Sequence, residues 1–347
     1  MKHSVRSRHL RTGWVGALLF FASTSSAWPN HVHMHGGPFI GVVLSVAVDP
    51  SAPKTLYVAA HGGGVFRSKD GGESWLALNQ GLPNRQVFSL LLDPRQAGNL
   101  YLGTDEGVFH STDQAVTWRS LSPILDKRNI RALAADPQDS ELLYAATDKG
   151  VFSGKKGRWR RLSVGIRHDD VRGLGVDPKG TVYAGTFGGV YKKETSQNRW
   201  REVGEGLTDK RIRAVVIDSL TSGIVYAGTA TSGVFKTTNG GEIWQEFNRG
   251  LLNSTVLSLL RVPERQSLYV GTVDGIFESQ SGTNQWRSIG PELPFTVSAI
   301  TYDPTQPQRL YAGSGGRLYK SDDAGKKWQE VSHRINYFGT VSLSTKR

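Results

Sequence analysis

The chain has 347 residues, no cysteine and a formal net charge of +12, from 42 Lys and Arg against 30 Asp and Glu. The absence of cysteine excludes disulfides and thiolate metal centres, so a chain of this length has to be stabilised by a buried apolar core. The basic charge favours acidic partners or anionic surfaces.

The first segment has the pattern of a secretory signal peptide. Residues 1–27 hold four basic and no acidic residues, an apolar run over 14–22, and small residues up to Ala27. An uncleaved anchor is the alternative, but the run is shorter than the roughly 20 residues that span a bilayer. We therefore expect cleavage after Ala27, no transmembrane segment afterwards, and a periplasmic or secreted protein. Its charge would be (42 − 4) − 30 = +8.

Residues 28–42 form a predicted N-terminal tail that contains His31, His33 and His35. Alternate residues of an extended strand share one side, and imidazoles arranged in this way can bind zinc, copper or nickel. The alternative is a solvated tail in which these histidines are merely polar, since nothing in the sequence fixes their orientation.

From residue 43 onward one pattern recurs at intervals of about 40 residues, the length of a four-stranded propeller blade. Its first run ends in Asp-Pro in most repeats, but in Asp218-Ser219 and Val262-Pro263 in two of them. The second run carries an apolar residue and a tyrosine, at Tyr57, Tyr101, Tyr144, Tyr183, Tyr226, Tyr269 and Tyr311. A tryptophan closes each unit, at Trp75, Trp118, Trp159, Trp200, Trp244, Trp286 and Trp328.

These runs are rich in Val, Tyr, Phe and Trp and are bounded by Gly, Pro and Asp, which is the signal of short strands. Each unit predicts four strands, the first like residues 43–49 and the fourth beginning at the tryptophan. The fold expected is all-β, a seven-bladed β-propeller of four-stranded blades over residues 43–347, in which ring closure protects the strand edges. Residues 335–343 are a candidate for a strand across the seam between the last and first blades.

Four repeats carry a turn of the form Ser-x-Asp-x-Gly-x-x-Trp between the third and fourth strands. Its members are Asp70, Gly72 and Trp75; Asp113 and Trp118; Asn239, Gly241 and Trp244; and Asp323, Gly325 and Trp328. Ala115 stands where the second turn should have glycine. The acid can accept hydrogen bonds from amides of its own turn, and the tryptophan can pack between sheets. We interpret these residues as structural, neither catalytic nor metal-binding.

These turns resemble the Asp-box (BNR) motif, and the repeats resemble BNR/Asp-box seven-bladed propellers over nearly the whole chain after the leader. The likeness extends to photosystem II assembly factor-type, sortilin-type and xyloglucanase-type propellers. The first type implies a single exported propeller with an Arg-rich surface that binds a partner protein. The xyloglucanase type implies a glucan-cleaving cleft between two propellers. Sialidases share the motif on six blades, but Arg261-Val-Pro263 here is the sixth repeat's version of the Asp-Pro turn.

The second position of the predicted innermost strand differs between repeats. It is arginine in repeats three, four and five, at Arg131, Arg172 and Arg213, whereas the other repeats have Leu44, Phe88, Leu257 and Ser298. Further cations precede the arginines in the same loops, at Lys127, Arg128, Lys210 and Arg211. Converging guanidinium groups repel one another unless an anion or carboxylate lies among them. We predict a partner-binding or anion-binding site formed by these seven residues.

The alternative for the arginines is a set of separate ion pairs with Asp169, Asp170 and Asp209, or side-chain stems packed between blades. The sequence does not decide between these two interpretations.

The first function hypothesis is an interaction scaffold that binds an acidic protein segment or anionic glycan and assists assembly of a larger complex. The alternative is a glycoside hydrolase or a glycan-binding protein of xyloglucanase or sialidase type. Its candidate acid pairs are Asp105-Glu106 and Asp169-Asp170, although a glycosidase needs carboxylates about 5–10 Å apart across the sugar, and sequence neighbours usually diverge. We expect no catalytic residue, no cofactor, no nucleic-acid partner and a monomer.

Overall fold

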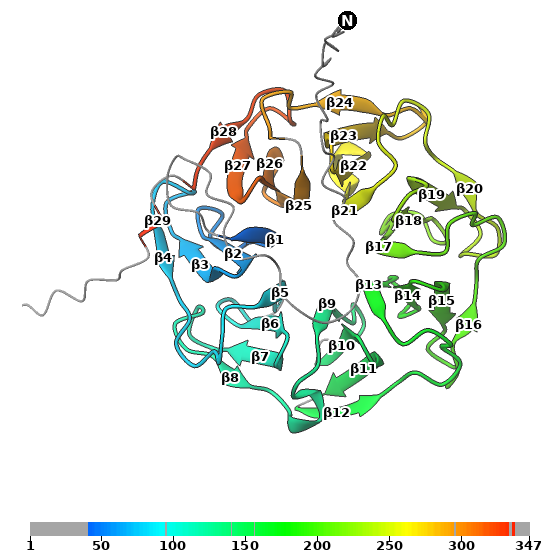
Figure 1. The fold of residues 1–347 in the computed structure, drawn as a ribbon, viewed down its shortest axis with the longest axis horizontal. Helices are drawn as coiled ribbons and strands as arrows, with labels where there is room; N and C mark the ends of the chain where they lie inside the picture. The colour runs from blue at the N-terminus through cyan, green and yellow to red at the C-terminus, as the bar shows by residue number, and fades with distance from the viewer. Residues whose placement is uncertain are drawn as a thin grey trace, which may run out of the picture. The chain divides into compact units, whose positions relative to one another are not determined.

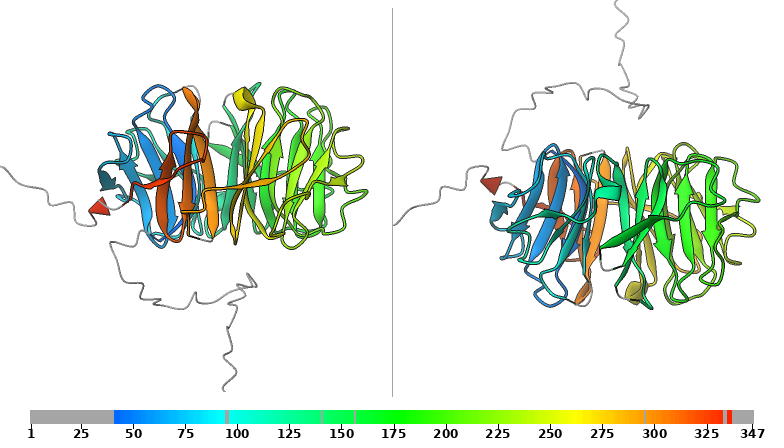
Figure 2. Two further views of the ribbon diagram at one scale, coloured as in Figure 1. Left: turned by 90° about the horizontal axis from the view of Figure 1, so that it is seen from above. Right: turned by 90° about the horizontal axis from the view of Figure 1, so that it is seen from below.

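The computed structural model describes residues 41–93, 96–139, 141–155, 157–294 and 296–332, together with the backbone of residues 335–336. The predicted signal peptide and His31, His33 and His35 lie outside these residues. The described residues form seven antiparallel sheets arranged as blades around an axis (Figures 1 and 2), which confirms the predicted seven-bladed propeller. In this part of the chain, no helix has the length and apolar character needed to cross a bilayer.

Each blade runs outward from the centre in chain order. The innermost strands are β1 (Val42–Val48), β5 (Val87–Leu92), β9 (Ile130–Ala135), β13 (Val171–Val176), β17 (Ile212–Ile217), β21 (Val256–Val262) and β25 (Val297–Asp303). The second strands are β2 (Leu56–His61), β6 (Leu100–Thr104), β10 (Leu142–Thr147), β14 (Val182–Thr186), β18 (Val225–Thr229), β22 (Ser267–Thr272) and β26 (Gln306–Ser314).

The outer half of each blade is shorter. The third strands are β3 (Gly64–Ser68), β7 (Gly107–Ser111), β11 (Gly150–Lys155), β15 (Gly189–Lys193), β19 (Val234–Thr237), β23 (Gly275–Gln280) and β27 (Arg317–Ser321). The outermost strands are β4 (Trp75–Ala77), β8 (Arg119–Ser120), β12 (Arg158–Arg161), β16 (Arg201–Glu202), β20 (Gln245–Glu246), β24 (Arg287–Ile289) and β28 (Gln329–Glu330). Two short 3₁₀ turns, η1 (Pro123–Leu125) and η2 (Pro263–Arg265), lie between strands.

The outermost strands do not all begin at the tryptophan. Only β4 does so, whereas β12 begins one residue earlier and the other five begin one residue later. In four of those five blades the backbone amide of the tryptophan donates to the preceding blade, and is therefore not available to its own sheet.

A pair of hydrogen bonds from each of these four tryptophans, here called the tryptophan clamp, joins consecutive blades. The backbone amide of Trp118 donates to Gln80 at 2.9 Å, and its indole Nε1 donates to Leu78 at 2.9 Å, both acceptors being backbone oxygens of blade 1. The same two bonds recur at Trp200, Trp244 and Trp286. Each hydrogen bond contributes about 0.5–1.5 kcal/mol net, in addition to the burial of a large aromatic ring.

At each clamp, a glycine follows the residue that accepts the backbone hydrogen bond, because the tryptophan's backbone leaves no room there for a side chain. Gly81 follows Gln80 with φ of +90°, and a Cβ atom placed on it would lie 2.1 Å from the backbone oxygen of Trp118. Gly250 has the same relation to Trp286, at 2.4 Å. The Gly-Leu pair that follows the tryptophan in these repeats is therefore part of the contact between blades.

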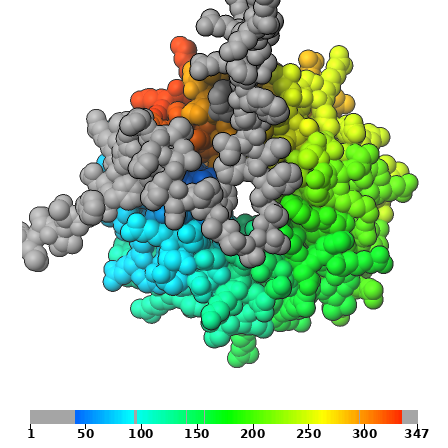
Figure 3. Space-filling view, in the orientation of Figure 1, coloured from blue at the N-terminus to red at the C-terminus, as the bar shows by residue number. Residues whose placement is uncertain are grey.

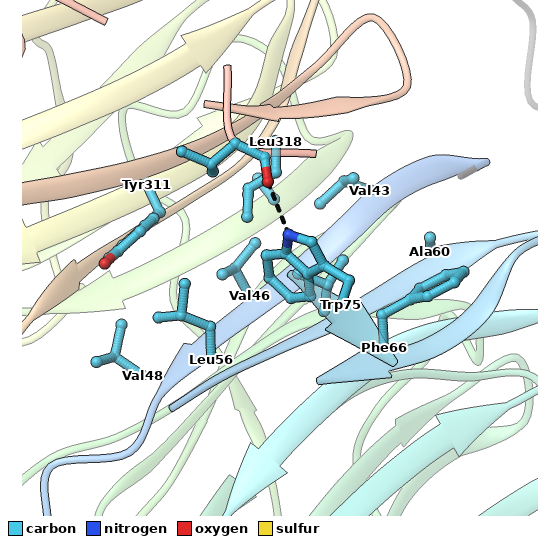
Figure 4. Close-up of a cluster of buried hydrophobic side chains, with 12 residues drawn as sticks. Val43, Val46, Val48, Leu56, Ala60, Phe66, Trp75, Tyr311 and Leu318 are labelled. Atoms are coloured by element: carbon cyan, nitrogen blue, oxygen red, sulfur yellow. Dashed lines mark hydrogen bonds between the residues drawn. The ribbon is translucent and has the colours of Figure 1, made fainter. Parts of the chain in front are cut away.

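The seam between blades 7 and 1 is closed by a variant of the clamp. The Trp75 indole donates to the backbone oxygen of Val331 at 2.7 Å, within a buried cluster that includes Tyr311 and Leu318 of blade 7 (Figure 4). Strand β29 (Ile335–Asn336) pairs in parallel with β4. The expected seam strand is thus confirmed over these two residues, while the remainder of 335–343 lies outside the described part.

The four Ser-x-Asp-x-Gly-x-x-Trp turns share one internal hydrogen-bond pattern. The Asp or Asn oxygen accepts from the backbone amide four residues later, at 2.9 Å for Asp70 and Ser74 and at 3.0 Å for Asn239 and Ile243. Burial raises the pKa of Asp70, but hydrogen bonds from Ser74 and Ser68 outweigh it and hold the pKa at about 2. Ala115 adopts φ of 69°, the left-handed conformation that the other three turns assign to glycine.

The two departures from Asp-Pro meet at the boundary between blades 5 and 6. Asp218 still caps its own turn, accepting from the Leu220 amide at 2.9 Å. It also forms a buried ion pair with Arg261 of blade 6 at 2.8 Å. Arg261 precedes Val262, the residue that replaces the usual aspartate, so a charge pair across the boundary accompanies the altered turn.

We predict that Gly81→Ala destabilises the fold more than Gly71→Ala. Both glycines have positive φ, but a Cβ on Gly71 would meet nothing within 4 Å. Gly71→Ala should therefore lower the free energy of unfolding by about 1–2 kcal/mol, because alanine is strained in a left-handed conformation. Gly81→Ala should lower it by about 1–3 kcal/mol more, because its Cβ also clashes with Trp118. Chemical denaturation measures both. Equal losses would show that the close approach to Trp118 is relieved without cost.

We predict that Asp70→Asn flattens the acid dependence of stability. A folded pKa of about 2 lies below the unfolded value near 4, so this aspartate stabilises the fold above pH 4 and loses that contribution as the pH falls toward 2. Asparagine already accepts the equivalent bond in blade 5. Melting temperatures between pH 2 and pH 6 should converge for the two proteins at the acid end. A variant that follows the parent curve throughout would contradict this role.

Candidate functional site

Every innermost strand contains a β-bulge at its start. The pairing with the second strand skips one residue in each blade, and the skipped residues, here called the bulge ring, are Leu44, Phe88, Arg131, Arg172, Arg213, Leu257 and Ser298. A bulge takes a residue out of the ladder and redirects its side chain. The position at which the sequence varies between repeats is therefore one that the sheet releases from pairing.

The bulge ring lies on one face of the propeller, here called the loop face. The start of each innermost strand pairs with the end of the second, as Val87 does with Thr104, so the turn after the second strand is on the same face. Aspartate-capped turns and Asp-box-like turns occupy the opposite face, here called the box face. The inner strands surround an opening at the middle of the propeller (Figure 3).

The bulge ring has two chemically different arcs. Blades 6, 7, 1 and 2 supply Leu257, Ser298, Leu44 and Phe88, and blades 3 to 5 supply the three arginines. All seven residues are half-buried. Phe88 lies against His61 with ring centroids 5.1 Å apart, so the uncharged arc includes an aromatic contact between blades 1 and 2.

Arg131 and Arg172 share one carboxylate. Arg131 Nε donates to Oδ1 of Asp170 at 2.8 Å, and Arg172 Nη2 donates to Oδ2 of the same residue at 2.8 Å. Arg172 also lies 4.1 Å from the centre of the Phe187 ring, a cation–π contact. Burial and then the charge of Arg131 lower the pKa of Arg172 from its ordinary value, against the opposing effect of Asp170.

The charge of Arg213 is compensated less than the charges of Arg131 and Arg172. Its Nε is buried and has no hydrogen-bond partner among the described residues. Burial, followed by the charges of Arg172 and Arg211, lowers its pKa, and only Asp209 acts in the opposite direction. These mutual effects show that the guanidinium groups lie close enough to interact. With Asp170, the three arginines carry a charge of 3 − 1 = +2.

Two of the four flanking cations form ion pairs with other residues. Arg211 binds Asp209 at 2.9 Å, and Lys210 binds Glu202 at 2.9 Å. Arg128 lies 5.8 Å from the Phe152 ring, and its Nε is buried with no hydrogen-bond partner in the described structure. Lys127 has a left-handed φ of 55°.

The predicted ion-pair alternative is met only in part. Asp170 pairs with two of the three ring arginines, but Asp169 pairs with Arg161 at 2.7 Å, and Asp209 pairs with Arg211. Of the other predicted acid pair, Asp105 accepts a hydrogen bond from Asn84 at 3.0 Å. Within the described residues, no group of three or more His, Asp or Glu side chains is placed to hold a metal ion.

Phe187 and His61 were not expected to contact ring residues. Each lies at or just after the end of a second strand, on the loop face. The contact with a ring position depends on the bulge, which a single strand's sequence does not reveal.

Solved structures share this architecture. An ancestral GH74 enzyme matches with a TM-score of 0.72 and 20% identity, over 85% of this chain and 47% of that chain. YCF48 from Cyanidioschyzon merolae matches with a TM-score of 0.63 and 16% identity, over 82% of this chain and 96% of its own. YCF48 bound to D1 peptide matches with a TM-score of 0.62 and 17% identity, over 82% and 94%.

These likenesses show the propeller fold. The chain spans about half the length of the GH74 enzyme, but nearly all of YCF48 is matched by it. No family model matches the sequence, and no curated protein matches it either.

We predict that Asp170→Ala destabilises the protein by about 1–2 kcal/mol, because two partly buried arginines lose their shared partner. Asp169→Ala removes a more exposed pair and should stay within about 0.5 kcal/mol of the parent. Thermal melts at low and high salt compare the stability of the two variants. Added salt should reduce the difference between their melting temperatures, because it screens the repulsion between the arginines. Equal stability of the two variants would mean that the ring arginines need no carboxylate.

Proposed function

We propose that this chain is an exported interaction scaffold whose bulge ring binds an acidic protein segment, and that it assists assembly of a larger complex. The observation that carries the proposal is the residual charge of +2 on three arginines of adjacent blades, of which Arg131 and Arg172 share the carboxylate of Asp170 and Arg213 does not bind it. Guanidinium groups present paired donors that match carboxylates, so an acidic side chain or a chain-terminal carboxylate would complete the compensation.

The uncharged arc adds a second requirement. Leu44, Phe88 and Leu257 are half-buried apolar residues at the same ring positions as the arginines. A bound segment that crosses the opening would therefore meet cations on one side and apolar surface on the other. The partner chemistry this supports is a peptide with carboxylates at one end and apolar side chains at the other. An anionic glycan would use only the arginine arc.

Two further observations support the proposal. The pattern of residues 1–27 is that of a secretory signal, which supports export to the periplasm or beyond. The peptide-bound structure of YCF48 is a propeller that this chain matches over nearly the whole length of that protein. A propeller of this size can thus serve as a peptide receptor without a second domain.

The alternative of a glycoside hydrolase has weaker support. The GH74 likeness covers only 47% of that enzyme. Of the candidate acid pairs, Asp169 and Asp170 are both bound to arginines, an arrangement suited to charge compensation and not to general acid catalysis. Turnover of a glucan or sialoside by the purified protein would revive this alternative.

We predict that Arg131, Arg172 and Arg213 changed together to Leu lose acidic-peptide binding while the fold is kept. Leucine already occupies the ring in blades 1 and 6, so the blades should still pack. Fluorescence anisotropy with a labelled peptide that has Glu residues at one end and Leu residues at the other should show at least about tenfold weaker binding of the variant in low salt. For the parent protein, the affinity should fall as salt is added.

The matched control removes the same charge from the box face. Lys54, Lys69 and Lys326 are exposed there, and changing them to Gln should alter the affinity less than about threefold. A peptide with Gln in place of Glu should bind the parent weakly. Equal loss in the two triple variants would assign the effect to net charge alone. Binding that ignores both the arginines and salt would overturn the proposal.

A further inference from the structure

A small cavity lies between blades 5 and 6 on the box face, opposite the face that carries the bulge ring. Tyr226, Lys236 and Phe247 line it from blade 5, and Arg261 and Ser279 line it from blade 6. Its volume is about 10 Å³, which is room for roughly one water-sized group. The exposed residues at its rim include Gln266, Ser281 and Asn284. The proposed peptide site uses none of these residues.

Ser279 occupies the first position of the turn that has lost the Asp-box pattern in blade 6. In blade 1, the Ser68 hydroxyl donates to Asp70 at 2.7 Å and accepts from the Gly72 amide at 2.9 Å. Ser279 is followed two residues later by Ser281 instead of an acid. Its hydroxyl oxygen is buried with no hydrogen-bond partner among the described residues, and the residue is only 2% exposed. Blade 6 therefore keeps the hydroxyl of the turn without the carboxylate that binds it in blade 1.

Lys236 supplies a positive charge from the facing blade. Lysine pairs with the second-strand tyrosine at the same register in blades 4, 5 and 7. In blades 4 and 7 an acid follows two residues later, so Lys192 lies 3.3 Å from Glu194 and Lys320 lies 3.0 Å from Asp322. In blade 5 an uncharged residue stands there, and Lys236 forms no ion pair with any described residue. Its charge is therefore left without a carboxylate beside the cavity.

The cavity lies in a positively charged environment. Arg261 is neutralised by Asp218 at 2.8 Å, and both side chains are almost fully buried. With Lys236, these three residues carry a charge of 2 − 1 = +1. The ammonium of Lys236 lies 5.7 Å from the centre of the Tyr226 ring and 5.5 Å from that of Phe247, and these cation–π contacts position it between the rings. An anion in the cavity would meet a cation that is already in place.

We propose that this cavity binds a small oxyanion, one oxygen of which enters the enclosed space. The Ser279 hydroxyl donates to that oxygen, as the equivalent hydroxyl of blade 1 donates to its aspartate, and Lys236 compensates the charge. The volume admits a single oxygen, so the rest of the ion lies at the rim, where the side-chain amides of Gln266 and Asn284 are further donors. Sulfate, phosphate and carboxylates share this charged oxygen, which defines the class of ligand.

The first experiment titrates the protein with sodium sulfate, sodium phosphate and sodium acetate, at an ionic strength held constant with sodium chloride. NMR shifts of backbone amides report where each anion binds. At least one oxyanion should saturate at millimolar concentration, with shifts centred on Lys236, Ser279 and Asn284. These shifts should persist when the three ring arginines are changed to Leu, which separates this cavity from the bulge ring. The proposal is overturned if no oxyanion saturates, or if saturating shifts occur only elsewhere.

The second experiment removes the positive charge. Lys236→Met keeps an unbranched side chain against the two rings and should weaken oxyanion binding by at least about fivefold. Lys320→Met is the matched control, because it changes the same register in blade 7, where the lysine already has Asp322 as its partner. This control should bind with the affinity of the parent. Equal losses in the two variants would assign binding to net charge and overturn the site.

The third experiment removes the hydroxyl and measures melting temperatures with and without the oxyanion that binds best. Without it, Ser279→Ala should melt at or above the parent, because the variant no longer buries a hydroxyl that lacks a partner. With it, the melting temperature of the parent should rise more than that of the variant. The comparison is between the two proteins because sulfate and phosphate also stabilise proteins by exclusion from their surface.

Ser68→Ala is the control for the hydroxyl, since it breaks the bonds to Asp70 and Gly72. It should melt below the parent in both buffers, and the oxyanion should raise its melting temperature as much as it raises that of the parent. An equal rise for Ser279→Ala and the parent would show that the Ser279 hydroxyl does not bind the ion, and would overturn the site.

Discussion

The contact between consecutive blades is the interaction on which the rest of this structure depends. A blade buries one face on each neighbour, and the tryptophan clamp sets the distance between them through a backbone and an indole hydrogen bond. Both donors belong to one rigid residue, so the two blades cannot shift past each other without losing both bonds. The glycine after each acceptor, as at Gly81, is needed because the neighbouring backbone leaves no room for a side chain.

Most of the fold follows from the sequence because the repeat is visible in it. Tyrosine, glycine and tryptophan recur at fixed offsets, and each is tied to a packing role that a single blade defines. The sequence prediction begins the outermost strand one residue early in five blades, and in four of these the backbone amide of the tryptophan, such as Trp118, donates to another blade. A prediction based on one repeat alone does not include hydrogen bonds that form between repeats.

The candidate site was predictable in composition but not in geometry. Repeat alignment brings Arg131, Arg172 and Arg213 to one position, and the structure places them within range of one another's charge. Repeat alignment could not indicate that Asp170 would pair with two of these arginines. The choice between Asp169 and Asp170 depends on the direction in which each side chain points after the loop.

The seam has a consequence for the order in which the propeller folds. Six of the seven blade contacts join segments adjacent in the chain, but the last joins Trp75 to Val331 and Ser298 to Val43, separations of 256 and 255 residues. Closing so long a loop carries the largest entropic cost of any contact in the ring, and little is gained until both partner blades exist. Blades 2 to 6 can therefore form by local growth, whereas the ring is complete only when the two ends of this arc meet. Amide protons around β4 and β29 should accordingly be among the earliest to exchange with solvent, because the seam opens without any blade unfolding.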